Sequence, residues 1–201
     1  MSRRWKHTSA NTLAIVALAG LSLACLLWTH PAPERSVMIT DLLIGLDDMP
    51  EGWNLRSGPE ESTLEYNVDE GLEIVFEADS PHARTVAVHV VLRYEDLDLA
   101  ARIYDEYVTP SDFGKASIPD GWVYRSVMVD PYHVFCYQKT LEPQNFCRWS
   151  GLYAEYIVIF HTWLIPERMT LEDFESIVTV IDRRTACSLG GPCLDSSRRS
   201  R

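Results

Sequence analysis

A nine-residue phrase occurs twice in this chain, as MPEGWNLRS at 49–57 and as IPDGWVYRS at 118–126. In each copy Pro and Gly bracket an acidic residue, which is typical of a tight turn, because Pro fixes one dihedral and Gly adopts a conformation that other residues resist. A large ring directly after a turn can cover it, so we expect Trp53 and Trp122 to be buried at the start of strands. The repetition therefore predicts a duplicated domain, with one copy of the phrase at the entry to each half.

Similar patterns follow both copies. Alternating apolar residues predict strands, and Asp96, together with Thr170 and Asp173, supplies helix start signals. An overlay of the two longest strands at an offset of 70 residues places His89 and His161 on the same relative face. The expected strands lie at 72–79, 85–94, 122–129, 132–138 and 155–164, and the expected helices at about 37–46, 96–108 and 170–184.

The order helix, turn, three strands, helix, turn, three strands, helix predicts an α+β fold. We expect a single antiparallel sheet of about six strands, built from two pseudo-symmetric βββα repeats, with helices packed mainly on one face. Repeat 1 spans about 37–108 and repeat 2 about 109–186. Neither repeat is large enough to bury the apolar surface that a stable fold needs on its own. Residues 31–36 form a short linker before this domain, and residues 187–201 form a disulfide loop and a basic tail.

The first 30 residues predict a membrane-targeting helix. Three basic residues precede an uncharged run at 13–28, a pattern that keeps the positive end in the cytoplasm and exports the body of the chain. Three fates fit this pattern: an uncleaved single-pass signal anchor, a lipid anchor on Cys25, and cleavage of a signal peptide after Ala24. All three place the body outside the cytoplasm, and the two anchored fates hold it at the plasma membrane.

The charge of the exported body indicates which classes of partner it can bind. All 29 acidic residues lie between Glu34 and Asp195. Of the 18 basic residues, three precede the apolar run and three lie in the last four positions, which leaves 12 for the body. Such an acidic surface repels nucleic acid, so the expected partners are the membrane, through the N-terminal segment, and a protein or small molecule.

Four cysteines follow the apolar run, in a compartment where disulfides persist. Cys136 and Cys147 flank a turn between two expected strands, and Cys187 and Cys193 close a short loop, so we expect two local disulfides. The alternative, a four-thiolate zinc site, lacks the short spacing that such sites use. No metal, no cofactor and no catalytic motif is expected from the sequence.

Histidines and aromatic residues supply the candidate ligand-binding set. His89 and His161 occupy corresponding strands, and Arg93 and Trp163 follow on the same strands. We therefore expect His89, His161, Trp163 and Arg93 to border one binding face. The leading hypothesis is non-enzymatic binding of a small ligand or protein partner. The alternatives are a hydrolase-like enzyme that uses His89 or His161, and a structural accessory of the cell envelope.

Overall fold

The computed structural model describes residues 37–64, 68–79, 84–108, 118–126, 131–138 and 145–191. These residues all belong to one unit, Val37–Arg201. The expected membrane segment and Cys25 therefore lie outside the described residues. Within the described ranges, no helix is both long and apolar enough to span a bilayer.

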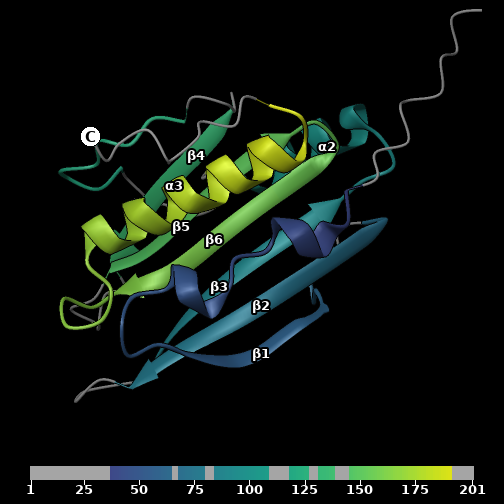
Figure 1. The fold of residues 1–201 in the computed structure, drawn as a ribbon. Coiled ribbons are helices and arrows are strands. Elements are labelled where there is room, and N and C mark those ends of the chain that lie inside the picture. Colours follow the sequence, from purple (N-terminus) through teal and green to yellow (C-terminus); the bar gives the residue numbers. More distant parts are fainter. Residues whose placement is uncertain are drawn as a thin grey trace, which may run out of the picture. The chain divides into compact units, whose positions relative to one another are not determined.

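Six strands and a few helices make up the described domain (Figure 1). In chain order they are η1 (Ile39–Leu42), η2 (Leu46–Asp48), β1 (Asn54–Glu61), β2 (Glu70–Asp79), β3 (Arg84–Arg93), α2 (Leu97–Ile103), the π-helical turn η3 (Tyr104–Val108), β4 (Tyr132–Gln138), β5 (Asn145–Tyr153), β6 (Tyr156–Leu164) and α3 (Leu171–Ser188).

All six strands form one antiparallel sheet, in the order β1-β2-β3-β6-β5-β4. The predicted α+β class and the single six-stranded sheet are confirmed. The first three strands form one half of the sheet and the last three form the other half, and the two halves meet where β3 pairs with β6. Two βββ units would give this order. The duplication itself stays a prediction.

Helices cover both faces of the sheet, and the longest of them, α3, lies on the same face as η1. Figure 1 shows α3 and the segment that holds η1 and η2 (purple) in front of the sheet, with α2 behind it. The side chains of α3 pack in one cluster with Val91, Val158 and Phe160. Those of α2 and η3 pack in a second cluster with Leu92 and Ile159. Because neighbours along a strand point to opposite faces, the two clusters lie on opposite sides, named here the α3 face and the α2 face.

The repeated phrase forms the same turn in both places. The N–H of Trp53 donates to the carbonyl of Pro50 at 3.4 Å, and that of Trp122 donates to Pro119 at 3.1 Å. The intervening glycines have φ of 87° and 88°, a left-handed conformation that other residues adopt at a cost. Both tryptophans are buried, as predicted. Only the first copy leads into a strand, because residues 122–126 after the second turn are irregular.

The helix start signals are confirmed. Asp96 accepts a hydrogen bond from the N–H of Leu99 at 2.7 Å, and Thr170 forms a capping box with Asp173 at the start of α3. The expected helix over 37–46 is wrong, because this stretch forms two short 3₁₀ turns. An extended Leu43 and Gly45 separate them and direct the apolar side chains onto the sheet.

Candidate ligand-binding face

His89 lies on the α3 face, fully buried between β3 and the N-terminal segment. Its Nδ1 atom accepts a hydrogen bond from the N–H of Ile44 at 3.2 Å, and its ring meets Phe160 edge-on at 6.4 Å. Burial, reinforced by the nearby Arg184 guanidinium, lowers the pKa of His89 from 6.5 to about 3. His89 is therefore a neutral residue of the core.

His161 and Trp163 lie on the other side of the sheet. In the β3–β6 register Val88 is opposite His161, and His89 is opposite Phe160. Directly opposed side chains of an antiparallel pair point to the same face. The expectation that His89 and His161 share a face is therefore wrong, because the sheet separates the two rings.

Arg93 does not join either histidine. It lies at the end of β3, where its guanidinium contacts Glu70 at 3.2 Å and Asp69 at 3.6 Å. Arg93 is opposite Tyr156, at the far end of the β3–β6 register from Trp163. Of the four predicted binding residues, the structure brings together only His161 and Trp163.

Phe146 completes a group of rings around these two residues. Its ring lies 5.4 Å from His161, 5.2 Å from Trp163 and 5.2 Å from Tyr137. All four side chains are partly exposed. On β6, His161 and Trp163 lie beyond Ile159, and on the paired strand β5 Phe146 lies beyond Ser150 in the same direction across the sheet. This part of the face is outside the cluster that α2 and η3 cover. This group, Tyr137, Phe146, His161 and Trp163, is named here the aromatic patch.

Arg148 gives the aromatic patch a positive charge. It is opposite His161 in the β5–β6 register and opposite Phe135 in the β4–β5 register, so it lies on the same face. Burial, with a smaller effect of the Arg148 guanidinium, lowers the pKa of His161 to about 4. The rings of the aromatic patch and the Arg148 guanidinium therefore share one face of the sheet.

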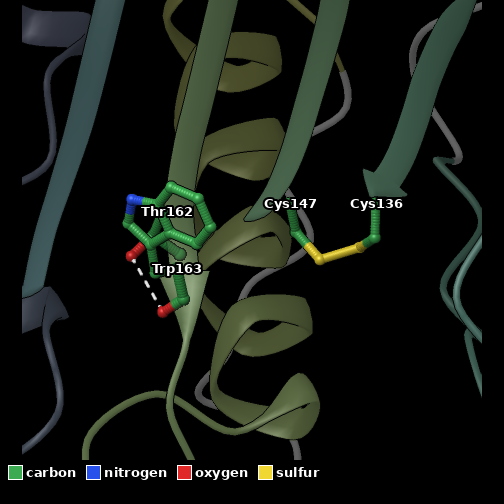
Figure 2. Close-up of a disulfide and its surroundings, with 4 residues drawn as sticks. All are labelled: Cys136, Cys147, Thr162 and Trp163. Atoms are coloured by element: carbon green, nitrogen blue, oxygen red, sulfur yellow. Dashed lines mark hydrogen bonds between the residues drawn. A yellow bond between two sulfur atoms is a disulfide. The ribbon is translucent and has the colours of Figure 1, made fainter. Parts of the chain in front are cut away.

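A disulfide joins the edge strand β4 to its neighbour β5, on the face of the sheet opposite the patch. Cys136 on β4 and Cys147 on β5 are opposite each other and bonded, as predicted. Figure 2 shows this bridge and, on the neighbouring β6, Thr162 and Trp163. Both cysteines are buried on the α3 face. Cys187 is also disulfide-bonded, but Cys193 lies outside the described residues, so that pairing stays a prediction.

A polar cluster borders the patch under η3. The Tyr104 hydroxyl donates to the carbonyl of Ser150 at 2.9 Å, and its ring stacks on His133 at 5.3 Å. Burial raises the pKa of Tyr104 and lowers that of His133. These contacts fix η3 to the sheet and set one boundary of the patch.

The described contacts of His89 and His161 are backbone, aromatic and cationic groups. A general-base histidine needs a carboxylate or other acceptor to orient its ring. Among the described residues neither histidine has one. The same ranges contain no group of three or more His, Cys, Asp or Glu side chains that could hold a metal ion.

The most elaborate polar cluster of the domain was missed from the sequence. Asp182 on α3 is 1% exposed and accepts hydrogen bonds from Tyr153 at 2.5 Å, from Ser126 at 2.8 Å and from Tyr124. Burial and the Asp182 carboxylate raise the pKa of both tyrosines. The signal was available, since Asp182 is four residues after the buried Val178 on the apolar stripe.

Comparisons with known proteins give a fold relationship. No protein-family profile and no curated protein sequence matches the chain. Among solved structures, the fold is similar to that of the extracellular domain of PknH from Mycobacterium tuberculosis, with 10% identity and a TM-score of 0.51. The match covers 77% of this chain and 97% of that one. At this identity the likeness concerns the fold.

Proposed function

We propose that this protein is a membrane-tethered extracytoplasmic domain that binds a small ligand on the aromatic patch without catalysing a reaction. The observation that carries the proposal is the group of partly exposed rings around Phe146, placed beside Arg148 on a rigid sheet. Aromatic rings supply apolar contact area, and a guanidinium supplies a hydrogen-bonding fork for an anion.

The ligand that suits this surface has a flat apolar face and a negative charge. Trp163 and Phe146, in edge-to-face contact, offer a ring edge and a ring face to such a ligand. Arg148 adds the charge that favours an anion over a neutral analogue. His161, held neutral by burial, would then act as a polar but uncharged neighbour.

The location outside the cytoplasm has separate support. The N-terminal charge and apolar pattern is that of an exported chain, and the buried Cys136–Cys147 disulfide suits an oxidising compartment. The similar fold is an extracellular domain in PknH. The Cys25→Ser variant distinguishes the two kinds of membrane anchor. Release of this variant from membranes indicates lipid attachment at Cys25, and its retention indicates a signal-anchor helix.

A dye titration tests the binding proposal. The probe is 8-anilinonaphthalene-1-sulfonate, a flat aromatic anion, and its neutral counterpart N-phenyl-1-naphthylamine lacks the sulfonate. We expect the anion to bind more tightly than the neutral dye, and Trp163→Ala to weaken anion binding about 30-fold or more, since hot-spot tryptophans contribute about 2 kcal/mol or more.

A matched control is Leu97→Ala, which removes an apolar side chain that is 52% exposed at the start of α2. It should leave the dye affinity unchanged. Equal affinity of the wild type and Trp163→Ala, or equal loss in Leu97→Ala, would show that the dye binds elsewhere and would remove the proposal.

A further inference from the structure

The segment over residues 37–49, named here the N-terminal cover, joins the body to the expected membrane tether. Its η1 turn packs against α3, β2 and β3. Several of its side chains are buried in the cluster of the α3 face, namely Ile39, Leu42, Leu43, Ile44 and Met49. Removing this segment would therefore expose apolar surface of β2 and β3.

Two residues of the body fasten the cover by polar contacts. Arg184 on α3 donates to the carbonyl of Leu43 at 2.6 Å and to the Asp48 carboxylate at 2.8 Å. His89 on β3 accepts the N–H of Ile44 at 3.2 Å. The Arg184 contacts join a guanidinium to a backbone carbonyl and to a carboxylate. The His89 contact depends on the protonation of one ring nitrogen.

The contact with Ile44 fixes the tautomer of His89. Because Nδ1 accepts a hydrogen bond, it carries no proton, and the proton of the neutral ring is on Nε2. The Nε2 atom is buried and has no hydrogen-bond partner among the described residues. A second proton could bind only at Nδ1, and it would break the bond to Ile44. Protonation of His89 and attachment of the cover at Ile44 therefore exclude each other.

The surroundings of His89 disfavour its cationic form. On the neighbouring strands, Ile74 of β2 and Phe160 of β6 are opposite His89, and neither titrates. From α3 the charged group that acts on the ring is the Arg184 guanidinium, whose partner in the cover is Asp48 of η2. An imidazolium here would be buried beside a like charge, so it is accommodated only when the cover moves away and admits water.

We propose that His89 is an acid-sensitive latch, whose protonation at Nδ1 releases the N-terminal cover from the α3 face while the rest of the sheet stays folded. The release would loosen the body from its tether and uncover apolar surface over β2 and β3. The latch is separate from the aromatic patch, which lies on the other face, so it does not rest on ligand binding.

The size of the response follows from the two protonation equilibria. In the closed state the pKa of His89 is about 3, and in the open state it returns to its ordinary value of 6.5. The ratio of open to closed molecules then rises about 30-fold between pH 7.5 and pH 5.0. Above pH 6.5 the latch is closed, and it weakens as the pH falls toward 3.

Hydrogen exchange of the full-length protein in detergent, followed by mass spectrometry, tests the latch. After correction for intrinsic rates, we expect protection of 37–49 to fall about 30-fold from pH 7.5 to pH 5.0, while β6 stays more strongly protected than 37–49 at both pH values. His89→Gln keeps an acceptor for Ile44 but cannot titrate, so its response should be absent. His161→Gln, altered on the other face, should respond like the wild type.

Three results would overturn the latch. They are unchanged protection of 37–49 in the wild type, an equal fall in His89→Gln, and equal protection of 37–49 and β6, which would indicate that both segments exchange by global unfolding. If His89→Gln does not fold, the imidazole ¹⁵N shifts of the wild type decide the question. At pH 7.5 they should show Nδ1 unprotonated and Nε2 protonated, and the opposite tautomer contradicts the proposal.

Discussion

Replacing Asp182 with Ala is expected to destabilise the domain by about 1–3 kcal/mol. The buried Tyr153 hydroxyl loses its acceptor, which costs about 1–3 kcal/mol, while the hydroxyls of Tyr124 and Ser126 are only partly buried and can turn to water. Relief of the buried charge offsets part of this loss. For a domain of this size the change lowers Tm by roughly 2–12 °C.

Urea unfolding followed by tryptophan fluorescence measures this change, and a double-mutant cycle separates the Asp182–Tyr153 hydrogen bond from the rest. Tyr153→Phe, Asp182→Ala and the double variant should give a coupling energy of about 1.5–3 kcal/mol, the range for hydrogen bonds to charged groups. Glu172→Ala, an exposed acidic residue at the start of the same helix, should change stability by less than about 0.5 kcal/mol. A coupling energy near zero would refute the reasoning.

Three further predictions concern the same core. Joint replacement of Cys136 and Cys147 by Ser should cost about 3 kcal/mol by the chain-entropy estimate for a sequence separation of 11, measured by urea unfolding against the oxidised wild type; no change would show that the bridge does not restrict the unfolded chain. Trp122→Ala should cost about 3–5 kcal/mol, because the ring is buried against Phe174, and an unchanged Tm would place the ring in solvent. Burial raises the pKa of Tyr153 in the folded state, with the Asp182 carboxylate adding to it. Stability should therefore be full below pH 10 and fall above it, less steeply in Tyr153→Phe, and equal slopes in the two proteins would contradict this assignment.

Local signals in the sequence predicted β2, β3, β4 and β6, the helix starts and the repeated turn, because each depends on a few adjacent residues. The strand expected over 122–129 is wrong, because residues 122–126 are irregular. Asp96 and Thr170 cap their helices, and Gly52 and Gly121 take the same left-handed conformation. Burial of Trp53 and Trp122 followed from that turn chemistry. The 3₁₀ turns at 37–48 could not be distinguished from a helix, because apolar spacing alone does not separate the two over so few residues.

The prediction of the candidate site was wrong because it assumed the wrong register between β3 and β6. An offset of 70 residues aligned Val90 with Phe160, but these residues point to the α2 face and the α3 face respectively. A strand alternates with a period of two, so an alignment error of one residue moves every side chain to the other face. His161 and Trp163 were placed together correctly, since they share one strand. Phe146 and Arg148 join them through strand pairing, which no local pattern in the sequence contains.

The most direct test of the account is the position at which an aromatic anion binds. In a ¹H–¹⁵N spectrum of the indole N–H groups, addition of 8-anilinonaphthalene-1-sulfonate should shift the Trp163 signal progressively. The signals of Trp53, Trp122 and Trp149, which are buried on the α3 face, should stay in place. Shifts at these buried tryptophans with Trp163 unmoved would contradict the claim that the protein binds its ligand on the aromatic patch.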